Sequence, residues 1–539
     1  MKAAFRWILF VLVFPVIQTT GQTLIPLEKS RTLYLEASFS PDARGVHTSI
    51  KPLVSGSEFT VSRSDSLWAP GARLEGKGKR WIVRKILYEH FLRADTSGFY
   101  IAADPLLDLS AGYDLMDQKM LYSNGRGLQL SGGFGHHLSF YSSYLESQAR
   151  FSSWIGDFVQ HYQVVPGMNR VKDFKADAYD FGLATAWVSY NPWRFLNLQL
   201  GYGKNFFGDG YRSLMLSDNS YNYPFLKISA RFNRFEYVSL FAGYQNLDTD
   251  SVLDAPVIWY NGYQKKGATF NYLSIHVTKW MQLGLFEGVI WKSRGLKDPA
   301  FNINQWIPVL FLNTIRYSLY DRNNVIIGTN VSFRPSRSVQ VYGQFVVDDI
   351  HFRKPSVWTY QKTKTGWQIG LKYFHVAGLP NLMLQTEFNR VRPYTYGHQD
   401  ALQSYTHNNQ ALAHPLGANF SEALLLLNYR YKRFYAGMQY QWASGGGDEG
   451  DTHWGSDIFL SDTRAENAYN SVGNHTGQGV QYQLNHAGFR FGYLLNPRYG
   501  LSGEIGIAYR NYTSALQNQN NLLLSLGLKT SFMNQYFDW

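Results

Sequence analysis

The sequence predicts an all-β fold, a transmembrane antiparallel β-barrel of about 18 strands preceded by a small helical region. Segments in which apolar and polar residues alternate recur along the chain, and 17% of the 539 residues are Phe, Trp or Tyr. Beyond the N-terminus, no apolar run approaches the roughly 18 residues that a membrane-spanning helix needs. Alternating strands with aromatic rims therefore fit the composition better than apolar helices do.

The N-terminus has the pattern of an export signal. Lys2 and Arg6 precede the apolar run WILFVLVFPVI, which is followed by the small and polar residues QTTGQ. Charge, apolar core and small residues in this order are typical of a cleaved signal peptide. We expect a signal peptide at residues 1–21 and localisation in the outer membrane of a Gram-negative bacterium. Cysteine is absent, which excludes disulfides and thiolate metal sites.

Residues 22–97 differ in character from the rest of the chain. Within KRWIVRKILYEHFLRA, residues 79–94, the apolar Ile82 and Ile86 share one side of a helix while basic residues occupy the rest. We predict a periplasmic N-terminal region, 22–97, with a short amphipathic helix; a plug folded into the barrel is the alternative. The barrel itself is then expected over 98–539.

Two segments illustrate the strand pattern. In FLNLQLGYG, 195–203, leucines at 196, 198 and 200 share one face with Tyr202, and Asn197, Gln199 and two glycines share the other. In LSGEIGIAYR, 501–510, the apolar residues should face lipid while Ser502, Glu504 and Arg510 face inward. Charges on the inner face are acceptable only if the lumen is polar, as in an outer-membrane barrel.

Short turns and long loops alternate along the predicted barrel. NPWR at 191–194, RPSR at 334–337 and NPRY at 496–499 are tight connections, expected at the periplasmic end. Segments 388–422 and 441–485 then lie outside the cell. An even strand number requires 293–324 to be a single external excursion, which we expect to fold toward the lumen. The last strand is predicted at about 521–533, and a final aromatic residue, Trp539, is typical of such a strand.

The net charge of +12 favours acidic partners. Removing the signal takes away two cations and leaves about +10. Anionic capsular or surface polysaccharide and the phosphates of lipopolysaccharide are the expected partners, although basic rims that meet anionic lipid head groups would explain the charge equally well. The sequence has no Lys/Arg-rich tract, so nucleic acid is not expected. We expect a monomer.

Two motifs resemble those of a known family. The segment GYGKNFFGDGYRSLMLSDNSYNYPFLKIS, 201–229, resembles a signature of the Wzi-like capsule-assembly outer-membrane proteins, at Gly203, Phe206, Phe207, Gly208, Gly210, Ser213, Leu214, Leu216, Ser217, Asn219 and Pro224. The segment from the predicted strand at Glu387 through RPYTYGHQDALQSYTHNNQALAHPLGANF, 392–420, resembles the second, at Glu387, Tyr396, His398, Leu412, His414, Leu416 and Gly417.

The resemblance covers residues 98–539 and is closest to a branch that includes RemB-type gliding-motility proteins. It implies a barrel that is occluded at least in part and holds capsular polysaccharide at the external surface. Lys204 and Arg212 stand where other members often carry tryptophan. A role in gliding motility, and a passive channel for small solutes, are the alternative functions.

Metal and catalytic sites are not expected. His398, His407 and His414 are 9 and 7 residues apart, which is not zinc-ligand spacing, and there is no HExxH motif. Asp448, Asp451 and Asp457 could gather around calcium, but a solvated acidic loop is the favoured interpretation. No GxSxG or comparable signature suggests a hydrolase, and no cofactor is predicted.

Sugar binding calls for aromatic faces together with polar and cationic side chains. The expected external loops contain these residue types densely. The predicted glycan-binding residues are Lys204, Tyr211, Arg212, Tyr221, Tyr223, Arg390, Arg392, Tyr394, Tyr396 and Trp454. Residues 392–420 should fold back over the lumen, with His398 and His414 bonded to loop backbone or to the inward carboxylate of Glu387.

Overall fold

The computed structural model describes most of the chain. The described residues are 24–39, 46–54, 67–69, 76, 78–135, 137–247, 263–293, 303–317, 323–350, 356–464, 471–531 and 533–539. The predicted signal peptide lies outside them. No helix among these residues is long and apolar enough to span a membrane.

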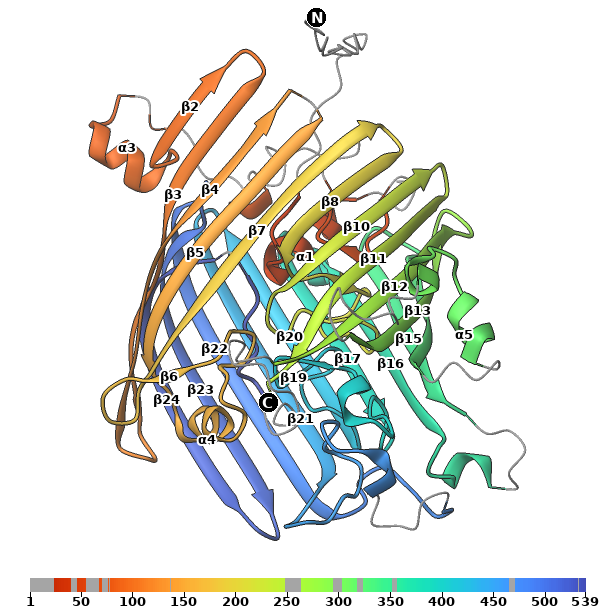
Figure 1. The fold of residues 1–539 in the computed structure, drawn as a ribbon. Coiled ribbons are helices and arrows are strands. Elements are labelled where there is room, and N and C mark those ends of the chain that lie inside the picture. Colours follow the sequence, from red (N-terminus) through yellow and green to blue (C-terminus); the bar gives the residue numbers. More distant parts are fainter. Residues whose placement is uncertain are drawn as a thin grey trace, which may run out of the picture.

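Eighteen antiparallel strands within the described residues form one closed barrel, as predicted (Figure 1). Each strand pairs with its neighbours along the chain, and the last strand pairs with the first to close the ring. The strands are β3 (Phe99–Asp114), β4 (Lys119–Phe134), β5 (Leu138–Arg150), β7 (Tyr179–Trp193), β8 (Leu196–Gly203), β10 (Tyr223–Phe232), β11 (Phe235–Asn246), β12 (Gln264–His276), β13 (Met281–Ser293), β14 (Asn324–Phe333), β15 (Val339–Asp349), β16 (Lys364–Phe374), β17 (Leu382–Val391), β20 (Phe420–Tyr431), β21 (Phe434–Gly447), β22 (Val480–Asn496), β23 (Leu501–Ser514) and β24 (Asn518–Thr530).

Shorter elements surround or enter this barrel. They are the strands β1 (Ile50–Lys51), β2 (Leu92–Thr96), β6 (Lys172–Asp173), β9 (Phe206–Phe207), β18 (Thr406–His407) and β19 (Gln410–Ala411); the helices α1 (Lys29–Ser38), α3 (Trp81–Leu87), α4 (Ser153–Tyr162) and α5 (Leu312–Tyr317); and the 3₁₀ turns η2 (Ile303–Trp306), η3 (Val357–Thr359), η4 (Val376–Gly378), η5 (Ala401–Gln403) and η6 (Asp462–Arg464).

The alternation read from the sequence sets the two faces of the wall. On β8, Leu200 is 67% exposed on the outer face, whereas Asn197 and Gln199 are buried on the inner face. Rings of Trp193, Phe195 and Phe232 stack along the outer rim beside a short turn, with centroids 5.7 and 4.8 Å apart. An apolar outer face with an aromatic rim is the surface that a membrane-spanning barrel presents to lipid.

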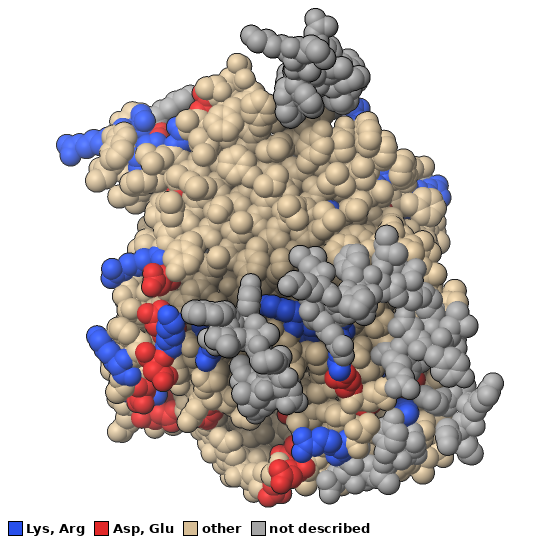
Figure 2. Space-filling model, viewed as in Figure 1, with Lys and Arg blue, Asp and Glu red and all other residues tan. Residues whose placement is uncertain are grey.

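The two ends of the barrel differ as expected. The turns at 191–194, 334–337 and 496–499 all lie at one end, the short-turn end, and the long connections lie at the other, the long-loop end. In Figure 1 the short-turn end is at the top. In Figure 2 the visible outer wall carries few charges over its upper part, and acidic and basic side chains gather toward the long-loop end.

Residues 293–324 form a single excursion between β13 and β14, as predicted, but its direction differs from the prediction. The described part, 303–317, which we call the outer strap, lies against the outside of the wall and not toward the lumen (Figure 1). Thr269 of β12 donates a hydrogen bond of 2.6 Å to the carbonyl of Gln305, and Trp306 stacks on Phe241 of β11 with centroids 4.9 Å apart.

The reason lies in polar residues on the outer face. Ser239 of β11, Asn271 of β12 and Glu287 of β13 are neighbours across the strands, and all three are buried. The Ser239 hydroxyl donates to the Asn271 side chain, and Glu287 accepts hydrogen bonds from the strap. Lipid cannot provide hydrogen bonds to such groups. The strap covers them, and its own Val309 and Ile315 are exposed.

The described N-terminal residues, 24–39 and 46–54, lie inside the barrel, near its short-turn end. Glu36 of α1 forms ion pairs with Lys372 of β16, at 2.5 Å, and with Lys51 of β1, at 3.2 Å. β1 in turn pairs with β9. We call these residues the N-terminal plug, and the assignment of 22–97 as a whole to a periplasmic region stays a prediction. The helix predicted within 79–94 is shorter in the structure than expected: α3 ends at Leu87, and β2 follows it. α3 lies outside the barrel at the short-turn end (Figure 1).

The C-terminal residues also enter the lumen. The last strand was predicted to reach 533, but β24 ends at Thr530, and the described residues after it, 531 and 533–539, turn back inside. The Tyr536 hydroxyl donates to Asp218, at 2.6 Å, and Trp539 packs on Phe158 of α4 with ring centroids 4.7 Å apart. Trp539 is therefore not part of the last strand. It contacts chain segments inside the lumen, such as α4.

Chain segments fill one side of the lumen. An apolar cluster joins Phe207, Leu214, Tyr405 and Leu412 to the inner faces of β10–β14. On the opposite side, Arg490 of β22 and Ser525 of β24 share the inner face with His486 and Gly506, and both side chains are exposed. The lumen is thus packed beside β10–β17, whereas Arg490 and Ser525 are exposed on the inner face of β22 and β24.

Candidate functional site

The connection between β8 and β10, residues 204–222, descends into the lumen and carries the first motif. Phe207 of β9 bridges to Leu216 within the same connection, and the Ser213 hydroxyl donates to the Phe207 carbonyl, at 2.5 Å. Gly208 has φ +143°, and a Cβ there would lie 2.2 Å from the side-chain amide of Gln344. Only glycine allows the connection to approach the wall so closely.

Glu387 of β17 holds this connection in place. One carboxylate oxygen accepts from the backbone N–H of Tyr211, at 2.7 Å, and the other from that of Arg212, at 3.0 Å. The Tyr342 hydroxyl donates to the same carboxylate, at 2.8 Å. Glu387 was predicted to take part in closing the external loop. Its partners are instead the backbone of the first motif.

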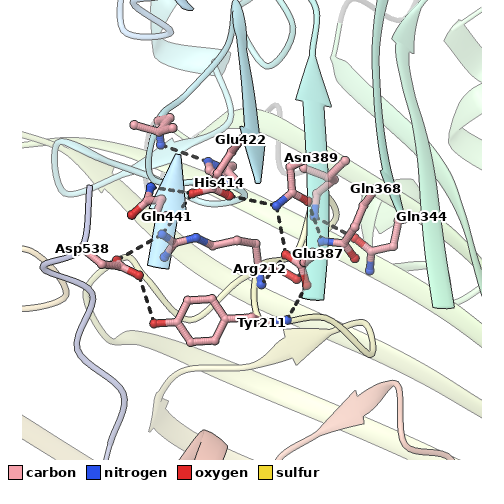
Figure 3. A network of polar contacts seen from close by, with 12 residues as sticks. Tyr211, Arg212, Gln344, Gln368, Glu387, Asn389, His414, Glu422, Gln441 and Asp538 are labelled. Carbon is pink, nitrogen blue, oxygen red and sulfur yellow. Dashed lines mark hydrogen bonds and ion pairs between the residues drawn. The ribbon is translucent and has the colours of Figure 1, made fainter. Parts of the chain in front are cut away.

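Arg212 lies at the centre of a buried polar network, which we call the lumen network (Figure 3). Its guanidinium is 3.2 Å from the carboxylate of Glu422 on β20 and 3.1 Å from that of Asp538. The side chain is 1% exposed. Asn389 donates to both Glu387 and Glu422, at 2.9 Å in each case, and so joins the two carboxylates.

Residues 392–420, which carry the second motif, fold across the lumen. The hydroxyls of Tyr396 and Tyr405 each donate at 2.7 Å, to the carbonyls of Leu214 and Met215. On the far side, the Lys266 ammonium of β12 donates to the carbonyl of Ser404. The two motifs therefore meet inside the barrel, because the second loop spans from β17 to β12 over the first.

The histidines of this loop have structural partners. His414 bonds to Glu422, at 2.7 Å, and not to Glu387, so it belongs to the lumen network. His398 accepts from the backbone N–H of Asp400, at 3.1 Å. His407 accepts from the N–H of Gln245, and burial lowers its pKa to about 3. Among the described residues, no group of three or more histidine and acidic side chains is arranged to hold a metal ion.

In the acidic loop at 445–457, the first carboxylate, that of Asp448, forms hydrogen bonds within the loop itself. Asp448 accepts hydrogen bonds from the backbone N–H of Trp454, the hydroxyl of Ser456, at 2.9 Å, and the N–H of Asp457, at 3.3 Å. Asp451 is exposed at the tip. The loop is thus folded by its own donors around Asp448.

The predicted glycan-binding residues are distributed over several environments. Five are buried and cannot reach a ligand in this conformation: Arg212, Tyr221, Tyr223, Tyr394 and Tyr396. Four are partly buried and already bonded or packed within loops: Lys204, Tyr211, Arg392 and Trp454. Arg390 is exposed on the outer face of β17. The structure does not bring these ten side chains together into one surface.

A pocket that the sequence did not indicate lies among the loops of the long-loop end. This mouth pocket encloses about 550 Å³ of space, including its opening. Five separate parts of the chain contribute to its lining, and three of them supply aromatic side chains: Phe158 and Tyr162 from α4, Phe459 just after the acidic loop, and Tyr536 and Trp539 from the C-terminal residues. In the sequence, the only indication of this pocket is the mixture of aromatic and polar residues in α4, SWIGDFVQHY.

Polar groups complete the mouth pocket. Asn219 of the first motif and Pro415, Leu416 and Gly417 of the second lie in its lining, together with Asp457. Both motifs therefore support the same pocket from below. Flat aromatic faces beside hydrogen-bonding groups form a surface suited to sugar rings.

An eighteen-stranded barrel with an apolar outer wall, an aromatic rim and a lumen partly filled by its own loops defines an outer-membrane β-barrel. The family model described as capsule assembly protein Wzi matches residues 121–499, more than half of the chain. The chain belongs to this family.

One solved structure supports the fold, and a second matches more distantly. Wzi of Escherichia coli is described as an outer-membrane protein involved in group 1 capsule assembly and as a carbohydrate-binding β-barrel. It matches over 96% of this chain and 100% of its own, with 11% identity and a TM-score of 0.54. OprD of Pseudomonas aeruginosa matches over 80% of this chain and 96% of its own, with 11% identity and a TM-score of 0.41. No curated protein matches the sequence.

Proposed function

We propose that the protein holds surface polysaccharide at the long-loop end of an outer-membrane barrel and assists capsule assembly there. The mouth pocket is the observation that carries this proposal. Phe158, Tyr162 and Trp539 are partly exposed in its lining, and rings of this kind stack on the C–H faces of sugars. The long-loop end faces the cell exterior in this proposal, because outer-membrane barrels place their long loops outside.

The lumen network has a supporting role in the proposal. It holds the first motif against β17 through Glu387, and it holds the C-terminal residues through the contact between Arg212 and Asp538. Both segments contribute to the lining of the mouth pocket. A rigid, buried network keeps the aromatic rings at fixed spacing, which reduces the entropy lost when a polymer binds.

Charged groups near the rim extend the contact surface. Arg390 and Arg392 lie at the long-loop end of β17 and can pair with the acidic units of an anionic polysaccharide. On the outer wall, Arg126, Glu146 and the pair Arg150–Asp177 fit the head groups of lipopolysaccharide. We infer a monomeric protein with a binding role and no catalytic step.

Polysaccharide retention in a deletion strain tests the proposal. Phe158→Ala with Trp539→Ala should lower the polysaccharide that stays on the cells, and Arg390→Ala with Arg392→Ala should lower it further for an acidic polymer. Trp358→Ala, at a 59% exposed ring outside the pocket, is the matched control. Full retention by the pocket variant at normal barrel levels would contradict the proposal. Scoring the same strains for gliding tests the motility alternative of the RemB-type branch.

A passive channel is the second candidate, favoured by the exposure of Arg490 and Ser525 on the inner face of β22 and β24. Ser525 faces this side of the lumen, whereas its neighbour Leu524 is 43% exposed on the outer face. If the open side conducts, Ser525→Trp should reduce single-channel current in a planar bilayer and Leu524→Trp should not. Equal currents for the two variants, or no current from the unaltered protein, would count against a channel.

A further inference from the structure

The charged side chains in the lining of the mouth pocket are one-sided. Within the described part of the chain, the residues that line it include no lysine or arginine, and Asp457 is their one acidic side chain. Asp448, Glu449 and Asp451 of the same loop lie within nine residues of it in sequence, and Asp448 bonds directly to the Asp457 N–H. A carboxylate-bearing sugar placed here would meet like charge, which disfavours binding.

The side-chain amides of the pocket are also one-sided, because their donors are in use while the Asn219 acceptor remains. The Asn219 side chain is 7% exposed; its amide nitrogen donates to the carbonyl of Ala411, at 2.8 Å, and its oxygen has no hydrogen-bond partner among the described residues. The amide groups of Asn409 and Gln410 donate to the carbonyls of Tyr162 and Met168. A buried acceptor without a partner is costly unless a ligand or water satisfies it.

Asp457 adds a second acceptor beside the aromatic rings. One of its oxygens accepts from the N–H of Phe459, at 2.8 Å. A carboxylate has room for about four hydrogen bonds, so it can accept further ones from a ligand. Ring faces from Phe158 and Tyr162 lie in the same lining. The pocket therefore offers stacking surfaces and acceptors to a ligand that donates.

We propose that the mouth pocket binds a saccharide unit without an acidic group, either a neutral hexose or an amino sugar, through ring stacking and through hydroxyl or ammonium donors to Asp457 and Asn219. This inference rests on the proposed function and sharpens it. In an acidic polymer, the uncharged or amino-bearing unit occupies the pocket, and the acidic units lie toward the exposed Arg390 and the partly buried Arg392 at the rim.

Binding of matched tetrasaccharides to the full-length protein in detergent tests the inference. The probes are tetramers of glucose, glucosamine and galacturonate, measured by calorimetry. Glucosamine and glucose should bind, and galacturonate should bind about tenfold or more weakly because of the acidic loop. Phe158→Ala should weaken the first two by about 2- to 13-fold, the range expected for the loss of one stacked ring.

Charge variants of Asp457 separate the electrostatic argument from folding. Asp457→Asn should reduce the difference between glucosamine and galacturonate, and Asp457→Lys should invert it. Asp451→Asn, at the exposed tip of the same loop, should leave the preference unchanged. Circular dichroism and heat-modifiability on gels identify variants that fail to form the barrel. If Asp457→Lys fails to form it, Asp457→Asn becomes the deciding variant.

The outcomes distinguish the two levels of the proposal. If galacturonate binds more tightly than glucose, or if Phe158→Ala and Asp457→Asn leave all three affinities unchanged while surface polysaccharide is still retained, the inference on the sugar class is overturned and the proposed function stands. If no tetramer binds and the pocket variants retain polysaccharide normally on cells, the proposed function fails together with it.

Discussion

Glu287, on the outer face of β13, accepts a hydrogen bond of 2.9 Å from the backbone N–H of Phe311, on a segment that lies outside the barrel wall. Its other oxygen accepts from the backbone N–H and the hydroxyl of Thr314, both at 3.0 Å. A carboxylate in the middle of a lipid-facing strand is unfavourable unless it is covered. The outer strap and this carboxylate therefore depend on each other.

Glu287→Ala should release the strap. Hydrogen bonds to a charged group contribute about 1.5–3 kcal/mol each, so losing the set should lower the local opening free energy by about 2 kcal/mol or more, which is roughly 30-fold faster hydrogen exchange. Exchange of residues 311–315 is the measurement, with Glu146→Ala, at a more exposed outer-face carboxylate, as the control. Unchanged exchange in Glu287→Ala would show that apolar contacts alone hold the strap.

Arg212→Met should destabilise the barrel strongly. It leaves the carboxylates of Glu422 and Asp538 buried without their cation, and breaking a buried pair in this way costs about 3–5 kcal/mol. Guanidinium unfolding in detergent, followed by near-ultraviolet circular dichroism, measures the loss. The triple variant Arg212→Met, Glu422→Gln, Asp538→Asn should recover part of it, because it removes the unpaired charges.

Arg126→Met, at an exposed position on the outer wall, is the matched control for that experiment and should change stability by less than about 0.5 kcal/mol. A comparable loss in both variants would mean that Arg212 contributes through general charge and not through the lumen network. An undiminished loss in the triple variant would point to side-chain packing.

The barrel itself could be predicted because strand periodicity carries the information. With a period of two, a shift of one residue exchanges the two faces, so Leu200 and Gln199 fix their positions from sequence alone. Turn chemistry at NPWR, RPSR and NPRY then indicated the two ends. An even strand number assigned 293–324 to one loop. The count of eighteen results from these local rules and needs no long-range contact.

The position of loops relative to the wall could not be predicted in the same way. Glu287 has the parity of Leu285 and Val289, and the sequence does not show that another segment will cover it. The mouth pocket could not be predicted from the sequence for a related reason. Phe158, Phe459 and Trp539 are far apart in the sequence and meet only because the C-terminal residues turn back into the lumen. The density of aromatic residues in the loops instead led to the prediction that tyrosines such as Tyr396 bind glycan. In the structure, Tyr396 is packed inside the barrel.

Acid should loosen the loop 392–420. His407 is neutral when the loop is closed, since its Nδ1 accepts from Gln245 and burial, with a smaller effect of Lys266 and Lys265, lowers its pKa to about 3. When the loop opens, the pKa of His407 returns to its ordinary value of 6.5. Between pH 6.5 and pH 3 the open state therefore binds more protons than the closed state, and it becomes more stable relative to the closed state as the pH falls. At pH 4.5 the shift is about 2.7 kcal/mol, roughly two pH units at about 1.36 kcal/mol each.

Hydrogen exchange of residues 403–412 at pH 7 and pH 4.5, corrected for intrinsic rates, measures this effect. Opening should rise by about 100-fold in the unaltered protein. His407→Gln removes the titrating ring and should flatten the dependence. Burial also lowers the pKa of His398 and His414, so a residual slope in that variant is expected to have the same sign. A loop that becomes more protected in acid would contradict the assignment.

Glu36→Leu should expel the N-terminal plug from the lumen. The substitution leaves Lys372 and Lys51 buried without their shared carboxylate, at a cost of about 3–5 kcal/mol to the docked state. The natural chain has no cysteine, so a single cysteine reports cleanly on docking. Ser49 lies in the plug and is 0% exposed, and cysteine is close to serine in size, so Ser49→Cys should be tolerated.

Maleimide labelling of Ser49→Cys measures release of the plug. Labelling should be slow in the otherwise unaltered protein and faster by about 100-fold or more when Glu36→Leu is added, since each ~1.4 kcal/mol is a factor of ten. Glu89→Leu, which removes a partly exposed carboxylate outside the lumen, is the matched control and should leave the rate unchanged. Slow labelling in both double variants would mean that the plug is held mainly by its apolar contacts, such as that of Leu33 with Met383.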